Sequence, residues 1–244
     1  MAGDVAGSLW AAIDSGLMDE LVPDLAALQM EQDPIHRHKD VLAHTVAVVA
    51  KTPDDLIVRL AALFHDIAKP RTRSFEHGGV TFRHHEVVGA RMAKKRLSGL
   101  GYPDDVVDDV ADLVRLSGRF KGYADGWSDA AIRRYARDAG PLLGRLNALI
   151  RSDCTTRNKA KVEALQALID DLERRIAELA EEDRRAAERP QIDGGAVMAH
   201  LGLEPGPEVG RIMKWLLELK RSEGELPEAE LLERLTSHWM SDSS

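Results

Sequence analysis

The sequence has little cysteine, few aromatic residues and no long apolar run. Its one cysteine, Cys154, cannot form a disulfide within the chain, so a reducing compartment is expected. Aromatic residues make up 5% of the chain, and its four tryptophans are too scattered to predict a base-stacking platform. No window approaches the roughly 18 apolar residues of a membrane span, and the start lacks a signal-peptide pattern. We therefore expect a cytoplasmic protein with no membrane contact.

Positive charge is also scarce. The chain carries 33 basic and 41 acidic residues, for a formal net charge of −8 at pH 7. This balance argues against strong, nonspecific binding to nucleic acid. With 244 residues, 44% of them hydrophobic and 30% charged, the chain has the composition of a soluble globular protein. It is long enough to bury the core of one large domain, or of one domain with an appendage.

Helical periodicity dominates the sequence, and signals for β-strands are few. Residues 71–83 break the pattern, and Gly78-Gly79 predicts a small hairpin or an irregular loop there. We predict an all-α protein with a helical domain over residues 1–156, of which 1–30 are a lead-in, and an appendage over 157–244. Apart from the two helices discussed next, we expect helices at residues 4–22, 84–98, 103–116, 128–138, 141–153, 157–188, 194–201, 207–223 and 227–237.

One apolar helical stretch ends in an imidazole beside a carboxylate. Thr52 and Pro53 provide a start signal, a threonine N-cap with proline at the first helical position. The apolar spacing then continues to His65 and Asp66, and Pro70 is expected to stop the helix. An imidazole and a carboxylate together can hold a divalent metal. Further ligands for such a metal would have to come from other parts of the chain.

The preceding helix, which Asp40 is expected to cap, carries His44 near its start. Consecutive helices joined by a short turn pack antiparallel, so His44 and His65 can meet. Asp153 ends an apolar helical run, where a carboxylate is unfavourable for the helix dipole unless a cation offsets it. Otherwise a surface carboxylate is the expected interpretation of Asp153. Mixed imidazole and carboxylate ligands suit Mn, Fe, Co, Ni or Zn rather than calcium.

The ordered set of His44, His65-Asp66 and a distant Asp153, with Leu-Phe-His-Asp-Ile-Ala-Lys at residues 63–69, resembles the HD-domain phosphohydrolase superfamily. Members of that family are all-α helical bundles that hold one or two divalent metals. The resemblance assigns His44, His65, Asp66 and Asp153 as metal ligands. It also implies hydrolysis of phosphate esters by a metal-activated water.

A narrower resemblance covers the chain from about residue 17 to 235. Residues 36–45, 69–73, 82–90 and 201–210 resemble the C-terminal half of bacterial CCA-adding tRNA nucleotidyltransferases, of the actinobacterial type. The nucleotidyltransferase head of that family does not occur in this sequence, so we expect that the chain does not add nucleotides by itself. Two alternatives stay open, a freestanding protein and an excised portion of a larger enzyme.

Three cations near the motif are candidates for binding phosphate. Lys69, one helical turn after Asp66, can act as a point charge. Arg73 and Arg119 are candidates for bidentate clamps on phosphoryl oxygens, although each arginine taken alone is more often a surface residue. The resemblance and the geometry also allow Asp66 to orient the attacking water.

The segment around His85 raises the question of a second metal. In HD proteins with two metals, a histidine at the position of His85 and another near residue 117 add ligands. This chain has Ser117 at the second position, so we expect one metal per chain. His85 is then expected to contact phosphate or to donate a proton to the leaving group. His84 shares that role or is structural.

We expect a hydrolase of phosphomonoesters or phosphodiesters, with nucleotides, including 2′,3′-cyclic ones, as the class to test. One alternative is an RNA-binding module without catalysis, for which the helix with Arg133, Arg134 and Arg137 offers a modest basic patch. Another is a di-iron oxygenase on the same scaffold, which needs a full two-metal ligand set. The apolar stripe from Val162 to Leu179 either packs on the core or forms a homodimer.

Overall fold

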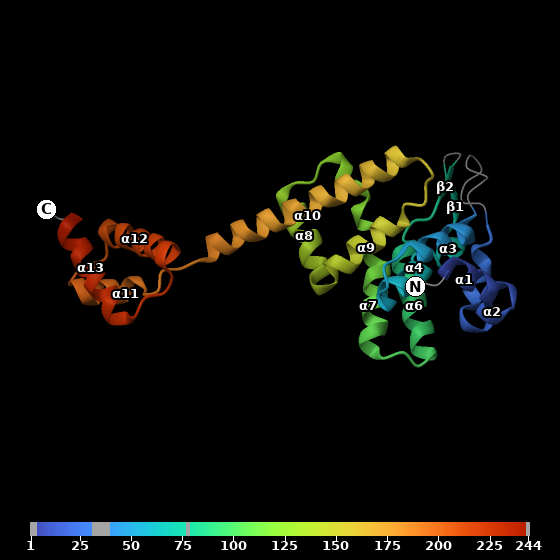
Figure 1. The fold of residues 1–244 in the computed structure, drawn as a ribbon, viewed down its shortest axis with the longest axis horizontal. Helices are drawn as coiled ribbons and strands as arrows, with labels where there is room; N and C mark the ends of the chain where they lie inside the picture. Colours follow the sequence, from blue (N-terminus) through green and yellow to red (C-terminus); the bar gives the residue numbers. More distant parts are fainter. Residues whose placement is uncertain (1–3, 31–39, 77–78, 243–244) are drawn as a thin grey trace. The chain divides into compact units, whose positions relative to one another are not determined.

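The computed structural model describes residues 4–30, 40–76 and 79–242, and it is built almost entirely from helices (Figure 1). This confirms the predicted all-α class. The α-helices are α1 (Val5–Asp14), α2 (Leu17–Leu21), α3 (Val41–Lys51), α4 (Leu56–Phe64), α5 (Lys69–Thr72), α6 (His85–Gly99), α7 (Asp104–Leu116), α8 (Asp129–Ala139), α9 (Leu143–Asp153), α10 (Lys159–Ala187), α11 (Gly194–Leu201), α12 (Pro207–Glu223) and α13 (Glu228–Asp242). Three short 3₁₀-helices accompany them, η1 (Pro23–Leu28), η2 (Arg119–Asp125) and η3 (Gly140–Leu142).

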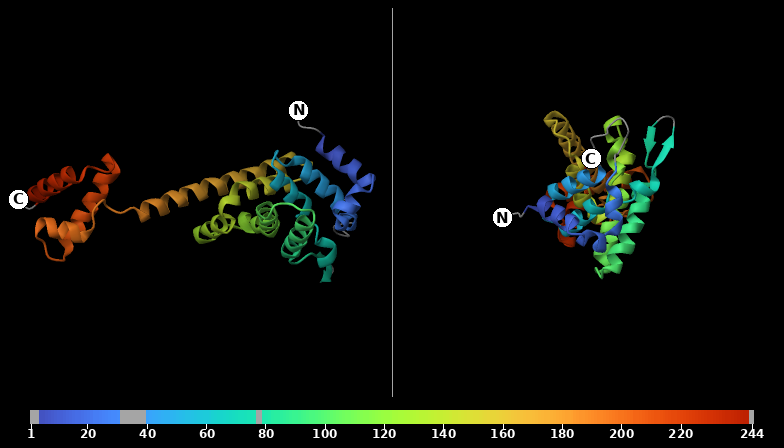
Figure 2. Two further views of the ribbon diagram at one scale, coloured as in Figure 1. Left: turned by 90° about the horizontal axis from the view of Figure 1, so that it is seen from below. Right: turned by 90° about the vertical axis from the view of Figure 1, so that its right-hand side faces the viewer.

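A small antiparallel hairpin lies between α5 and α6 in the sequence (Figure 2). Its strands are β1 (Ser74–Glu76) and β2 (Gly79–Thr81), with Phe75 opposite Val80. Of the two structures that the sequence allowed here, the hairpin is the one found. Within the described part of the chain, no helix is both long and apolar enough to cross a membrane.

The chain divides into two compact units, Met1–Leu179 and Ala180–Ser244. The division falls within α10, whereas the boundary predicted at residue 156 falls in the loop between α9 and α10. Each unit has its own hydrophobic core.

The core of the first unit is built from α3, α4, α6, α7 and α9, with the first part of α10 packed on it. Helix α4 is central, because it contacts α3, α7 and α9, and its residues Ala61, Ala62 and Phe64 are buried. The apolar stripe of α10 contributes Ile169 and Leu172, both fully buried. The stripe therefore packs on the chain's own core, and the homodimer that was the alternative gains no support.

The second unit is a small three-helix assembly of α11, α12 and α13. Its buried residues are Val197, Ile212, Leu216, Leu231 and Leu235. The side chain of Gln191 adds a polar tie: its amide donates to the Leu226 carbonyl at 2.7 Å, and its oxygen accepts from the Leu226 N–H at 3.0 Å. This pair of bonds holds the segment before α11 against the loop between α12 and α13.

The single helix predicted over residues 4–22 is two helices, α1 and α2. Gly16 separates them with a φ of +78°, in the left-handed region that glycine adopts without steric cost. The apolar spacing continues through both helices, and for this reason periodicity alone did not show the break.

The helix that leads to His65 and Asp66 begins later than predicted. Asp55, not Thr52, is its N-cap, and its carboxylate accepts hydrogen bonds from two backbone N–H groups of the first turn, at 2.9 and 3.1 Å. Helix α4 also ends at Phe64, well before Pro70. Pro70 lies instead in the first turn of the short helix α5, where its missing N–H costs nothing.

Candidate metal and phosphate site

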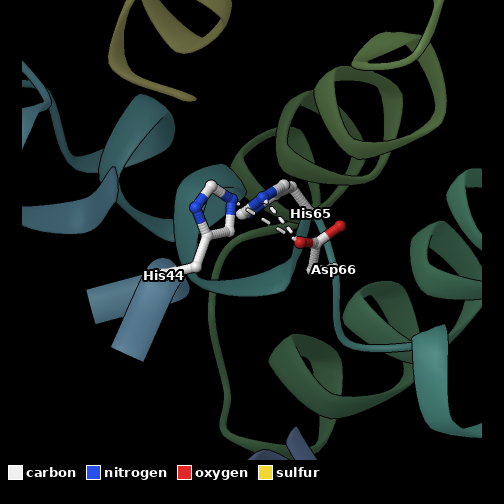
Figure 3. Close-up of side chains that lie close together, drawn as sticks. All are labelled: His44, His65 and Asp66. Carbon is white, nitrogen blue, oxygen red and sulfur yellow. Dashed lines mark ion pairs between the residues drawn. The ribbon is translucent and has the colours of Figure 1, made fainter. Parts of the chain in front are cut away.

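Two imidazoles and a carboxylate meet where the start of α3 lies beside the end of α4 (Figure 3). His44 is in the first turns of α3, which Asp40 caps, and His65 and Asp66 follow the last residue of α4. Asp66 Oδ2 is 3.2 Å from His65 Nε2 and 3.7 Å from His44 Nε2. One ligand atom from each of the three residues lies within 4.8 Å of the others.

The imidazoles are held so that each one turns its Nε2 atom toward Asp66. His65 Nδ1 lies 2.7 Å from a backbone carbonyl three residues earlier, and His85 Nδ1 has the same arrangement at 2.7 Å. His44 Nδ1 lies 2.9 Å from the hydroxyl of Thr155. A carbonyl can only accept, so His65 and His85 donate from Nδ1, and in its neutral form each ring has its lone pair on Nε2. Metal-binding histidines are oriented in this way.

His65 shows that this site fits a cation. Its side chain is 6% exposed, and its Nε2 atom is buried without a hydrogen bond to any described residue. The nearest carboxylate oxygen, Asp66 Oδ2, is also an electron-pair donor. Two such atoms at 3.2 Å need a proton or a metal ion between them. Imidazole nitrogen with carboxylate oxygen is a donor set for a divalent transition metal.

Asp153 brings a second carboxylate from the end of α9. Its Oδ1 atom is 3.0 Å from His44 Nε2 and 3.7 Å from His65 Nε2, and its side chain is 50% exposed. Burial acts to raise the pKa of Asp153, but the hydrogen bond with His44 and the charge on His65 lower it on balance. The four residues predicted as ligands therefore lie together, although Asp153 is far from the other three in the sequence.

The charges at the site are strongly coupled. Lys69 donates to Asp66 Oδ2 at 2.7 Å, and both side chains are buried. Burial alone would raise the pKa of Asp66, but the positive charges of His65 and Lys69 hold it well below its usual range. Burial disfavours the charged form of His65, yet the negative charges of Asp66 and Asp153 outweigh this and raise its pKa to about 9.

His85 approaches Oδ1 of Asp66, the oxygen that does not face His44 and His65. Its Nε2 atom is 3.6 Å from Asp66 Oδ1, whereas His44 and His65 face Oδ2. Burial lowers the pKa of His85, although the Phe82 carbonyl acts in the opposite direction. A neutral imidazole with a free Nε2 lone pair suits a proton acceptor or a ligand better than the proton donor expected from the sequence.

These side chains line a cavity of about 320 Å³. A shallower hollow of about 450 Å³ adjoins it and shares Lys69, His85 and Lys121 with the cavity wall. The cavity is lined by His44, His65, Asp66, Lys69, His85, Ser117, Gly118, Lys121, Asp153, Cys154, Thr155 and Thr156.

The family model described as "HD domain" matches residues 40–234. The chain belongs to the HD-domain family.

Two curated relatives give this HD domain a narrower context. It is 35% identical to a CC-adding tRNA nucleotidyltransferase of Thermus thermophilus, over 92% of this chain and 50% of the relative. It is 33% identical to an A-adding tRNA nucleotidyltransferase of Deinococcus radiodurans, over 93% of this chain and 53% of the relative. The chain thus spans about half the length of the curated relatives it matches. The resemblance found in the sequence, to a portion of such enzymes, is confirmed.

Several residues predicted for substrate binding lie elsewhere in the HD domain. Arg119 forms an ion pair with Asp138 at 3.0 Å, and Arg73 lies over the ring of Phe75 at 5.1 Å. Neither is among the residues that line the cavity. His84 lines the adjoining hollow, as the one non-glycine residue with positive φ in the described chain, at +62°.

Ser117, the residue that argued for a single metal, does line the cavity. Its hydroxyl donates to the Val114 carbonyl at 2.9 Å. It therefore contributes no nitrogen donor opposite His85. The residues described here offer one group of two imidazoles and a carboxylate that could hold a metal, and one ion per chain stays a prediction.

Among the residues of the cavity wall that the sequence did not predict, Thr155 and Lys121 make the clearest contributions. Thr155 holds His44, and Lys121 brings a second ammonium group. A signal for Thr155 existed, because Thr155-Thr156 follow Asp153 directly and share its loop. No sequence signal indicated Lys121, since it lies in the 3₁₀-helix η2 and the direction of its side chain depends on how η2 packs.

Proposed function

We propose that this HD domain hydrolyses phosphate esters with the help of a divalent transition metal. Nucleotide phosphomonoesters or phosphodiesters, including 2′,3′-cyclic ones, are the proposed substrates. The observation that carries the proposal is the buried Nε2 atom of His65, which lies 3.2 Å from Asp66 Oδ2, a distance at which a proton or a metal ion must lie between the two atoms. The ammonium of Lys69 beside it adds a means to attract an anion.

The metal would be held by His44, His65, Asp66 and Asp153, the residues whose donor atoms converge at the cavity. When bound, such an ion supplies Lewis acidity toward a phosphoryl oxygen and lowers the pKa of a water molecule toward neutrality. Mn, Fe, Co, Ni and Zn all suit this donor set.

Side chains of the protein can bind the phosphate group and orient the water molecule. Lys69 neutralises part of the charge of Asp66 and keeps a buried ammonium at the cavity wall, where a phosphoryl oxygen can accept from it. Asp66 Oδ1 and His85 Nε2 are acceptors on the side of the carboxylate away from His44 and His65. They can accept the protons of a water molecule and orient it. We propose Asp66, Lys69 and His85 as the catalytic groups.

The test is hydrolysis of bis(p-nitrophenyl) phosphate by purified protein loaded with Mn, Co or Ni. Wild-type protein should release p-nitrophenolate only with metal, and Asp66→Ala should abolish the release. The matched control is Asp105→Ala, which removes an exposed carboxylate from the first turn of α7 and should leave the rate unchanged. Equal rates for wild type and Asp66→Ala, or no hydrolysis with any metal, would refute the proposal.

A second candidate function is RNA binding without catalysis. It is favoured by the names of the two relatives, both tRNA nucleotidyltransferases. Arg134 and Arg137 are exposed on α8 and give that helix a basic face. Binding of tRNA that weakens steeply as salt increases would support this function. No detectable binding at low salt would exclude it.

A further inference from the structure

Lys121 occupies an unusual position between the cavity and the adjoining hollow. Its side chain lines both of them. Lys121 belongs to η2, which follows His85 in the sequence, whereas Lys69 precedes His85. Its side chain is 73% exposed, and its Nζ atom lies 3.4 Å from Glu86 Oε1, which is long for an ion pair. Lys69, in contrast, is buried and bonded to Asp66 at 2.7 Å. Lys121 is thus the cation on the wall that is able to move.

We propose that Lys121 binds the phosphate group of the substrate together with Lys69, and that it makes the site favour phosphomonoesters over phosphodiesters. This inference rests on the proposed function and names the preferred substrate class. In this proposal Lys121 determines specificity. It contacts the third non-bridging oxygen, which a phosphomonoester has and a phosphodiester lacks.

The charges along the cavity wall support this preference. The negative charges of Asp66 and Asp153 match the two positive charges of a divalent ion. Among the residues that line the cavity, the ammonium groups of Lys69 and Lys121 then remain, with two positive charges. The carboxylate of Glu86, 3.4 Å from Lys121, lines the adjoining hollow and not the cavity, and it stays there when Lys121 turns to the phosphate. A phosphomonoester dianion balances them, whereas a phosphodiester monoanion leaves one unmatched. The flexible four-carbon stem of Lys121 allows its ammonium to leave Glu86 and reach the phosphate.

Glu86 and Gly118 explain how Lys121 is kept at the rim. A Cβ atom on Gly118 would lie 2.2 Å from Glu86 Oε1, so a side chain at this position would displace the carboxylate from where it meets Lys121. The φ of Gly118 is −80°, which any residue can adopt, so the requirement is for space and not for conformation. Glu86 then offers Lys121 a weak partner that a doubly charged phosphate can displace.

The arginines that the sequence suggested do not compete for this role. Arg119, two residues before Lys121, is held by Asp138 at 3.0 Å, and this contact lies outside the cavity. Among the residues that line the cavity, Lys69 and Lys121 are the two with cationic side chains apart from histidine. A phosphate in the cavity would therefore be bound by ammonium groups and not by a guanidinium.

The first test compares two substrates with the same leaving group, p-nitrophenyl phosphate and bis(p-nitrophenyl) phosphate, on Mn-loaded protein. Lys121→Gln should lower kcat/KM for the monoester by about tenfold, mainly by raising KM. This is the effect expected from the loss of one hydrogen bond between charged groups. For the diester we expect a loss of less than about threefold. Lys121→Arg should recover most of the monoester activity, because it keeps the charge. The matched control is Lys94→Gln, since Lys94 is also exposed and also paired with a carboxylate, Asp108 at 2.6 Å.

The second test measures binding without turnover. Calorimetric titration of Mn-loaded protein with inorganic phosphate should give a Kd about tenfold weaker for Lys121→Gln than for Lys94→Gln. If wild-type protein hydrolyses neither ester, the proposed function fails, and this inference fails with it. If wild type is active but Lys121→Gln lowers both activities equally, or neither, only the role of Lys121 is refuted. Hydrolysis of the diester alone by wild type would also refute it.

Discussion

The buried pair of Asp66 and Lys69 yields the sharpest prediction about stability. The two side chains are 4% and 9% exposed, and their charged atoms are 2.7 Å apart. Asp66→Asn leaves the ammonium of Lys69 buried beside a neutral amide. Lys69→Met leaves the carboxylate of Asp66 beside His65. The two substitutions break the same bond but leave different charges behind, so we expect different costs.

Removing one member of a buried pair generally costs about 3–5 kcal/mol, because the other charge stays desolvated. For Asp66→Asn we expect about 3 kcal/mol, since the amide oxygen can still accept from Lys69. For Lys69→Met we expect about 1–2 kcal/mol, because metal-free His65, with its pKa raised to about 9, stays protonated at pH 7 and faces Asp66. The double substitution should cost at least about 1 kcal/mol less than the sum of the two.

The buried pair of Asp66 and Lys69 also determines how the stability of the folded protein changes with pH. The pKa of Asp66 is held well below its usual range, so its contribution to stability is present above the carboxyl pKa of the unfolded chain. That contribution is lost as the pH falls through the lower pKa of the folded protein. Asp66→Asn should therefore flatten the loss of stability in acid.

The assay must report on the first unit alone, because the two units need not unfold together. Native-state hydrogen exchange in EDTA, read by mass spectrometry on peptides of α3 and α4, gives this local free energy. Lys94→Met and Asp108→Asn, on an exposed pair, should show no measurable coupling in the same cycle. Equal costs for Asp66→Asn and Lys69→Met, or additivity within about 0.5 kcal/mol, would refute the reasoning.

Four further predictions concern the cap, the metal, the pH dependence of metal binding and a buried hydroxyl. Asp55→Ala should destabilise the first unit by about 1–2 kcal/mol, while Asp55→Asn, which keeps the cap, should cost less; urea unfolding at pH 7 checks this. In scanning fluorimetry, Mn at about 100 times its Kd should raise the Tm of wild-type protein by roughly 5–10 °C and should not raise that of His65→Ala. Mass spectrometry should find one metal per chain and not two irons. Because the metal must displace the proton of His65, its affinity in calorimetry should rise about tenfold per pH unit up to a pH of about 9. Tyr135→Phe should cost about 1–3 kcal/mol in urea unfolding, because the Asn147 oxygen that accepts from the hydroxyl at 2.7 Å stays buried without that donor.

Much of the candidate site could be predicted because it depends on local rules. His44 and His65 lie on consecutive helices, and a short turn forces such helices to run antiparallel. Asp66 is adjacent to His65 and needed no further argument. Asp153 was different: a carboxylate at a helix end is a weak signal, and the resemblance to the HD family was needed to favour a ligand over a surface carboxylate.

The parts that could not be predicted depend on tertiary packing or on competing local signals. The direction of Lys121 follows from how η2 is seated, and nothing in its neighbours in the sequence reveals that. At the start of α4, the signals of Thr52-Pro53 and of Asp55 overlap, and the double hydrogen bond of the aspartate prevails. At Gly16 the apolar spacing continued across the break, so periodicity predicted one helix where there are two.

The anchoring of the imidazoles has a consequence for how fast the site can exchange its ion. Rotating the ring of His65 or His85 by 180° would replace an N–H with a C–H against a backbone carbonyl. The rings are therefore preorganised, and little side-chain entropy is left to lose when an ion arrives. Capture of a metal should then be a single kinetic step whose rate is set by entry and dehydration of the ion, with no slower isomerisation after it. The same pocket should exchange one transition metal for another without local unfolding.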